Sequence, residues 1–477
     1  MNEHTTEQVG VPPLLAALLT LLAGHRPAFR QERPYQRAVA LVFGELFAFG
    51  RHTVTQALLA LGLSATDWTA FYRLFSRPRF EEARLASCLF GETLAQSRPD
   101  EPYVAGIDGT QIPRTSHKLP GSSWLRAPRT PVFKKGIHRA QRFLHGAWLP
   151  AVVAGYTRAI PIRFLPAFPA KARPAEAPPC KEWEAGLVFI GWLRLQLDAA
   201  GRAGQRLVVL ADGAFDTLGL WQDLPDRVTL LVRTAKNRRL CHLPAGQVGR
   251  GRPRKYGAAA PRPHEWLGKR KGFQKTRIDV RGRNFELRYR VLGPYLRERA
   301  PDRPLFLLVV GGATWRAGKR EPKRARREPA FYLVNAEAQG AGWTLPLPAP
   351  VLLAWIWQRW ELEVAHREMK GSFGVGQKQC WNRRSAVVSV QWSVWVYAVL
   401  VLAGYRTWGW LGGPKRPERW WPGAQRWSFN TLWRGYRAAL WGTREFRALW
   451  TPLRDDWLKK EAAFQALLNA VLGAARL

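Results

Sequence analysis

Three carboxylates stand out in a chain that is otherwise strongly basic. Asp108 and Asp212 each follow a short apolar run and precede a glycine, and Glu363 lies in a segment of helical periodicity at 350–370. Carboxylates at the ends of neighbouring strands are suited to hold Mg²⁺ through their oxygens. Two such ions about 4 Å apart can activate a nucleophile and stabilise the leaving oxygen of a phosphodiester. The three residues are therefore predicted to be catalytic and to bind two Mg²⁺ ions, for which Mn²⁺ can substitute.

Glu363 is the only acid on its face of the predicted helix. A helical wheel places six residues on the same face, namely Leu352, Ile356, Arg359, His366, Arg367 and Lys370. Apolar residues flank this face on both sides, as expected for a face that lines a cleft. Its four basic side chains are predicted to contact DNA phosphates. Glu361 and Glu368 fall on the opposite side, where solvent exposure is expected.

Each of these acids also has an ordinary structural explanation. An Asp after a strand can satisfy the backbone of a turn. Glu363 can form i,i+4 salt bridges with Arg359 and Arg367 on a surface helix. The occurrence of acids on two strands and one helix, next to basic groups, favours phosphoryl transfer over these explanations.

The elements that must position these acids form an α/β arrangement. Residues 1–100 are predicted to be a helical DNA-binding domain. Two short helices in it, at 52–61 and 64–76, are compatible with a helix-turn-helix and with an ordinary helical bundle. Residues 101–232 are predicted to form the first part of a mixed-sheet core, with strands at 103–107, 143–156, 160–164, 207–211 and 228–232 and helices at 183–197 and 215–224.

A basic segment interrupts this core at 233–345. The chain holds 74 Lys and Arg against 35 Asp and Glu, a net charge of +39, and residues 233–328 hold 28 basic and 7 acidic residues. Strand alternation at 277–291 and 305–310 predicts a β-rich insertion. The core is predicted to resume at 346–405, before a Trp-rich helical region at 406–477 with a final helix at 457–475. The charge points to a polyanionic partner, first of all nucleic acid.

One motif in the insertion suggests a way to bind DNA. The sequence R-G-R-P-R-K at 250–255 resembles an AT-hook core, which lies extended in the narrow minor groove of A·T-rich DNA. The alternative is a basic loop that touches phosphates without preference. Both interpretations predict DNA contacts from Arg250, Arg252, Arg254 and Lys255.

Cysteine spacing and hydropathy bear on the compartment. The four cysteines lie far apart, so neither a disulfide framework nor a zinc site is expected, and a reducing compartment fits. Residues 387–405 carry no charge over 19 positions and are long enough to span a bilayer. Gln391, Ser389 and Ser393 favour a helix buried in the protein instead, and no membrane partner is predicted.

The spacing Arg359-x3-Glu363-x6-Lys370 resembles the Y-R-E-K signature, Y-x2-R-x3-E-x6-K, of bacterial insertion-sequence DDE transposases. Ile356 stands where that signature has its Tyr. The order Asp108, Asp212, Glu363 and the large β-rich insertion before the Glu are also similar to that family. The resemblance covers about residues 100–405.

The resemblance implies an RNase H-like core of the retroviral-integrase superfamily and Mg²⁺-dependent cut-and-paste transposition. It implies double-stranded DNA partners, both terminal inverted repeats and target, bound by a homodimer in the prokaryotic cytoplasm at the nucleoid. It further implies a flipped base stacked on an aromatic residue of the insertion, for which Trp266, Trp315 and Trp343 are candidates. Two alternatives remain open, a non-catalytic DNA-binding protein derived from a transposase and an RNase H-like nuclease without strand transfer.

Overall fold

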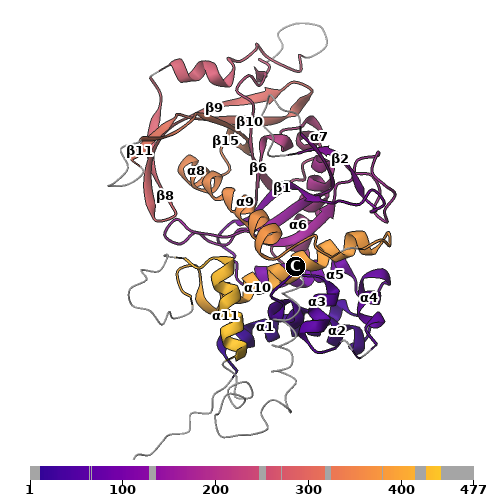
Figure 1. The fold of residues 1–477 in the computed structure, drawn as a ribbon. Helices are drawn as coiled ribbons and strands as arrows, with labels where there is room; N and C mark the ends of the chain where they lie inside the picture. The colour runs from indigo at the N-terminus through magenta and orange to yellow at the C-terminus, as the bar shows by residue number, and fades with distance from the viewer. Residues whose placement is uncertain are drawn as a thin grey trace, which may run out of the picture.

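The computed structural model describes residues 11–63, 65, 67–127, 136–245, 254–269, 271–316, 324–378, 380–413 and 426–441. For residues 313–316 and 324–327 the structure describes the backbone alone. The helix predicted at 457–475 lies outside the described residues. A large mixed sheet occupies one half of the described part, and a bundle of helices occupies the other (Figure 1).

The central strands have the arrangement of an RNase H-like core. In sheet order they are β4 (Ile160–Pro166), β3 (Ile137–Trp148), β1 (Tyr103–Pro113), β5 (Leu207–Ala211) and β6 (Val228–Arg233), and β2 (Ser122–Arg126) pairs with the first half of β3. β4, β3 and β1 are antiparallel neighbours, whereas β1, β5 and β6 run parallel. Every residue of β5 is buried, which is why its sequence is continuously apolar.

The insertion extends the same sheet beyond β6. Its strands follow in the order β13 (Ala330–Asn335), β10 (Ala300–Val310), β9 (Arg283–Arg297) and β7 (Leu240–His242), while β8 (Gln274–Val280) pairs with β9. Two small hairpins complete it, β11 (Ala313–Arg316) with β12 (Arg324–Arg327) and β14 (Glu337–Gln339) with β15 (Gly342–Thr344). The predicted mixed α/β fold with a β-rich insertion is thus confirmed.

The single strand predicted at 277–291 is wrong. Arg281 and Gly282 adopt positive φ angles of 53° and 70°, so the chain turns back and forms the hairpin of β8 and β9. Two central residues with positive φ match the right-handed twist of the strands they join. A glycine marks this turn, but Arg281 carries no such mark in the sequence.

Helices cover both faces of the central strands. α6 (Glu182–Ala199) packs on the face to which Ile107 points, since Gly186 of α6 approaches the Ile107 side chain. α9 (Trp360–Arg367), which follows α8 (Ala349–Gln358), packs on the other face, where Leu362 approaches Gly106. Because successive side chains of a strand point to opposite faces, Asp108 points to the α9 side.

The helical half contains segments from both ends of the chain. Its members are α1 (Pro13–Gly24), α2 (Glu32–Phe47), α3 (Val54–Ala60), α4 (Thr69–Ser76), α5 (Glu82–Leu94), α10 (Ser385–Trp408) and α11 (Phe429–Trp441). α3 and α4 correspond to the two predicted short helices, and Thr53 caps α3 by accepting the N–H of Gln56. α4 begins at Thr69, five residues after the predicted start at 64.

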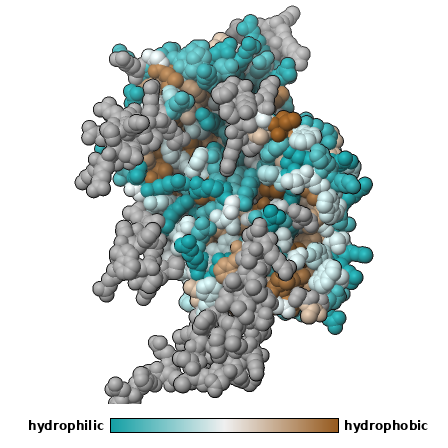
Figure 2. All heavy atoms as spheres, viewed as in Figure 1, coloured by the Kyte–Doolittle hydropathy of each residue, from teal (hydrophilic) through white to brown (hydrophobic). Residues whose placement is uncertain are grey.

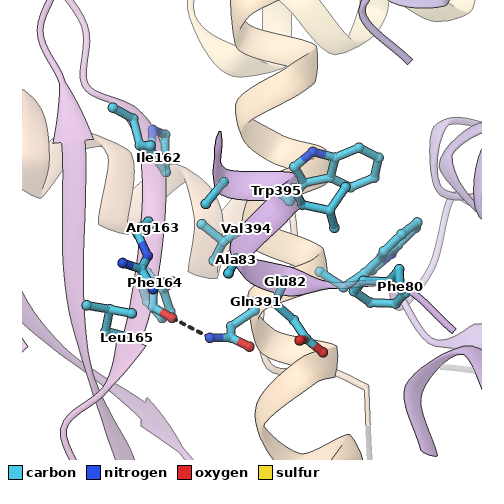
Figure 3. A pocket seen from close by; sticks show the side chains of 14 residues that line it. Phe80, Glu82, Ala83, Ile162, Arg163, Phe164, Leu165, Gln391, Val394 and Trp395 are labelled. Atoms are coloured by element: carbon cyan, nitrogen blue, oxygen red, sulfur yellow. Dashed lines mark hydrogen bonds between the residues drawn. The ribbon is translucent and has the colours of Figure 1, made fainter. Parts of the chain in front are cut away.

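α10 is the apolar segment that raised the question of a membrane. Within the described residues it is the one helix long and apolar enough to cross a bilayer, and 94% of its apolar window is buried inside the protein. It packs between α5 and β4, where Gln391 Nε2 donates to the Phe164 carbonyl at 2.9 Å (Figure 3). Core packing therefore accounts for its composition.

The surface of the insertion is polar and basic. Hydrophilic side chains predominate in Figure 2 around the end of the molecule where β9 and β10 lie in Figure 1. Exposed positions of the β8–β9 hairpin include Lys275, Arg277, Arg283 and Arg288. The excess positive charge of the sequence is thus partly displayed on one hairpin.

Candidate active site

The sheet register brings Asp108 and Asp212 together. Ile107 of β1 pairs with Ala211 of β5 in a parallel ladder, so the next residue of each strand lies beside the other at a spacing of about 4.8 Å between strands. β5 ends there, and Asp212 Oδ1 accepts the N–H of Gly213 at the start of a 3₁₀ turn. β1, in contrast, continues to Pro113. The predicted end of that strand at residue 107 is therefore wrong, because β3 pairs with it beyond the point where β5 stops.

Glu363 joins the two aspartates through Arg359. Arg359 Nη2 donates to Glu363 Oε1 at 2.8 Å, and Arg359 Nη1 lies 3.7 Å from Asp108 Oδ2. The guanidinium thus lies between a strand carboxylate and a helix carboxylate. The i,i+4 salt bridge considered for a surface helix does form, but at the strand edge and next to Asp108.

Negative charge exceeds positive charge around Asp108. Burial raises the pKa of its carboxyl to about 7. Arg359 opposes this rise, whereas Asp212, Glu363 and Glu182 add to it. A site that already lacks compensating positive charge favours the arrival of a cation.

Two histidines line the α9 side of the site. His366 Nδ1 lies 3.9 Å from Asp108 Oδ2, and its Nε2 lies 2.9 Å from Nδ1 of His145, the cross-strand neighbour of Asp108. Burial lowers the pKa of both rings, that of His145 to about 3. His366 is therefore neutral near pH 7, and a DNA contact by it, which stays a prediction, would be a neutral hydrogen bond.

The helix carrying Glu363 is less regular than predicted. The segment 350–370 divides into α8, α9 and a π-helical turn at Glu368–Ser372, with Arg359 between α8 and α9. Arg367 is exposed, and Lys370 is half-buried. Their DNA contacts remain predictions.

Glu361 and Glu368 are buried, so their predicted exposure is wrong. Glu361 accepts hydrogen bonds from Arg281 Nη2 at 2.8 Å and from Arg426 Nη1 at 3.0 Å. Glu368 pairs with Arg158 Nη2 at 2.5 Å and accepts the Tyr397 hydroxyl at 2.7 Å. Both acids face other parts of the chain, which a wheel of one helix cannot reveal.

A fourth acid near the site, Glu182, is not predicted from the sequence. It is the first residue of α6, and its side chain reaches the strand edge beside Gly109, where a Cβ would lie 1.1 Å from Glu182 Oε1. Burial raises its pKa, Arg142 opposes the rise and Asp212 adds to it. The available signal was the glycine after Asp108, which leaves room for a group from another element.

The structure describes only some of the other residues predicted to contact DNA. Arg250 and Arg252 lie outside the described residues, whereas Arg254 and Lys255 are exposed. Trp266 packs against the core, with Lys269 Nζ 4.3 Å from its ring centroid, and Trp343 is exposed on β15. The side chain of Trp315 is outside the described part.

A cavity of about 680 Å³ opens beside Arg359, between the β8–β9 hairpin and the α8–α9 segment. Its lining combines aromatic and basic side chains, including Phe285, Tyr332, Trp357, Trp360, Arg233 and Arg281. Trp360, one of the apolar residues that flank the Glu363 face on the helical wheel, is 52% exposed. The residues that line this cavity come from separate elements, so the sequence pattern does not predict it.

The donor set suits a hard divalent cation in kind, because carboxylate oxygens are the ligands that Mg²⁺ prefers. In the part of the chain that the structure describes, no three acidic, histidine or cysteine side chains converge closely enough to hold a metal as they stand. Arg359 is instead the one guanidinium shared by Asp108 and Glu363, and it offsets their negative charge in part. A metal would have to take over part of that role.

Comparison with known proteins identifies the family. No curated protein matches the sequence. A solved structure described as a piggyBac transposase synaptic complex with hairpin DNA, determined by cryo-EM, is similar at 13% identity and a TM-score of 0.38, covering 94% of this chain and 84% of that chain. The family model described as DDE superfamily endonuclease matches residues 24–290, more than half of the chain and a range that includes Asp108 and Asp212. The chain therefore belongs to the DDE superfamily of endonucleases.

Proposed function

We propose that this endonuclease is a DNA transposase of the Y-R-E-K group from a bacterial insertion sequence. It cleaves transposon ends and joins them to target DNA with the carboxylates of Asp108, Asp212 and Glu363. The observation that carries this proposal is the meeting of three acids at one edge of the sheet around Arg359. Each acid comes from a different element, so chance pairing within one helix or turn does not account for the group.

Each residue of the site has a task that its position supports. Two Mg²⁺ ions held by the three carboxylates would activate water or a 3′-hydroxyl and stabilise the leaving oxygen. Asp108 and Asp212 are fixed by paired strands and Glu363 by a helix, so their oxygens are held in place before DNA arrives. Arg359, no longer required as their counter-ion, can pair with a phosphate next to the scissile bond.

Basic and aromatic groups around the site fit DNA as the substrate. Arg367 is exposed on α9 and the β8–β9 hairpin displays further cations, which would neutralise phosphates on either side of the acids. The cavity at Trp357 and Trp360 is open and lined by arginines. It offers a displaced base a stacking surface in addition to Trp343. A homodimer that holds two DNA ends, at the nucleoid of a prokaryotic cell, completes the proposal.

The test uses DNA fragments that carry the sequences flanking the coding region on each side. Full-length protein with Mg²⁺ should nick these fragments at a defined position and join the freed end to a plasmid. Asp108→Asn, Asp212→Asn and Glu363→Gln should each reduce cleavage by about 10³-fold or more while retention of the fragment in a gel-shift assay is unchanged. Glu286→Gln, which removes an exposed acid of β9, is the matched control. Cleavage retained by any of the three variants would refute the assignment.

A nuclease without strand transfer is the second candidate, because the matching family is described as an endonuclease. Fragments that already end in a free 3′-hydroxyl separate the two. The transposase joins them to plasmid DNA in the presence of Mg²⁺, whereas the simple nuclease leaves them unjoined. A non-catalytic DNA-binding protein would bind the fragments and neither cut nor join them.

A further inference from the structure

We propose that Glu182 is a fourth acidic ligand of the divalent-cation site, admitted to the strand edge by Gly109. This inference rests on the proposed function, since it adds a residue to the same site. Asp108 approaches the site from the α9 side of β1, whereas Glu182 belongs to α6, which packs on the other side. The two acids therefore reach one edge of the sheet from its opposite faces.

Gly109 is the feature that makes this approach possible. A Cβ built on it would lie 1.1 Å from Glu182 Oε1 and 2.2 Å from the carboxyl carbon. Any other residue at 109 would occupy the space of that carboxylate. The backbone of Gly109 lies in β1 without a positive φ, so its glycine is explained by this close approach and not by a turn.

Local contacts account for the position of Glu182 only in part, through one long ion pair with Arg142. The start of α6 is capped by Glu184, whose Oε2 accepts the N–H of Lys181 at 2.8 Å. Arg142 Nη1 lies 3.9 Å from Glu182 Oε2, which is too long for a hydrogen bond. The side chain remains 25% exposed. Its carboxylate adds negative charge at the edge where Asp108 and Asp212 already lie, and the distant Arg142 offsets this charge only in part, so a bound cation would lower the remaining repulsion.

The experiment measures binding of Mn²⁺ to the full-length protein by calorimetry, without DNA. Glu182→Gln should weaken Mn²⁺ binding by about tenfold. Glu184→Gln is the matched control, because it removes the same charge from the same helical turn. Gly109→Ala keeps the carboxylate but displaces it, so it should weaken binding to a similar degree, whereas Gly204→Ala, whose Cβ meets open space, should not. Combining Gly109→Ala with Glu182→Gln should produce no further loss.

The outcomes separate this inference from the proposed function. If Glu182→Gln binds Mn²⁺ as the unmodified protein does while Asp108→Asn does not bind it, the fourth ligand is refuted and the three-acid site stands. If Asp108→Asn binds Mn²⁺ unchanged, or the unmodified protein binds none, both are overturned. Thermal melting checks that each variant is folded, and Gly109→Ala gives the answer independently should Glu182→Gln fail that check.

Discussion

Asp212 and Asp216 stand four residues apart after the same strand, yet their surroundings differ sharply. Asp216 is buried, accepts hydrogen bonds from Trp221 Nε1 at 3.0 Å and Thr234 Oγ1 at 2.6 Å, and pairs with Arg238 and Arg297. Asp212 accepts the N–H of Gly213, its own neighbour in the turn. The first carboxylate connects strands, helix and insertion, whereas the second leaves its oxygens largely available.

The segment around α9 repeats this contrast. Glu361 and Glu368 are each held by arginines from distant parts of the chain, whereas Glu363 shares the single guanidinium of Arg359 with Asp108. The acids that are fully paired with arginines stabilise the fold. The acids with too little positive charge around them lie together at the edge of the sheet where β5 ends. Such a local excess of charge is typical of functional sites, where stability is lower than the fold could provide.

The largest expected effect on stability comes from breaking a paired acid. Glu368→Gln leaves Arg158 buried with only a neutral partner, so the free energy of unfolding should fall by about 3–5 kcal/mol. Urea denaturation followed by tryptophan fluorescence measures it, with Glu286→Gln as the exposed control. If the control lost as much stability, the buried ion pair of Glu368 would contribute no more to the free energy of unfolding than an exposed acid does.

The next effect separates the two aspartates. Asp216→Asn should lower the free energy of unfolding by about 2–4 kcal/mol, because Arg238 and Arg297 lose their counter-charge. Asp212→Asn should change it by less than about 1 kcal/mol and still abolish Mg²⁺-dependent cleavage. Denaturation curves and cleavage assays on both variants provide the measurement. Similar losses of stability in the two would remove the distinction drawn between them.

Removing the under-compensated charge should stabilise the protein. The pKa of Asp108, about 7, lies above its ordinary value. The loss of stability caused by its charge is therefore absent below about pH 4, grows between about pH 4 and pH 7, and is constant above that. In the absence of metal, Asp108→Asn should therefore raise the free energy of unfolding by about 2 kcal/mol at pH 8. The gain should become progressively smaller towards pH 4. Melting temperatures across this pH range test it. A gain that does not depend on pH would point to packing instead of charge.

The smallest effect concerns the shared counter-ion. Arg359→Met leaves Asp108 and Glu363 facing each other without a cation, which should lower the metal-free stability by about 1 kcal/mol at pH 8. Added Mg²⁺ should restore most of this loss, because the ion supplies the missing positive charge. Melting temperatures with and without Mg²⁺ measure the difference. If Mg²⁺ raises the melting temperature of the variant no more than that of the unmodified protein, Arg359 and the metal do not share this role.

Much of the core could be predicted because its signals are local. The strand at 207–211 matches β5, since a short buried parallel strand is apolar throughout. α6 differs from its predicted range of 183–197 by one residue at its start and two at its end. The β8–β9 hairpin was missed, because Arg281 carries no sequence mark of the positive φ it adopts.

The sequence by itself determined the fold class, the basic character of the insertion, and the order of Asp108, Asp212 and Glu363 along the chain. These follow from periodicity and composition, which depend on neighbours in sequence. Only the tertiary structure decided which acids are paired, because the partners of Glu361 and Glu368 come from elements up to some 200 residues away. The approach of Glu182 over Gly109 was likewise decided by packing, since it depends on how α6 crosses β1 and not on the residues next to either one.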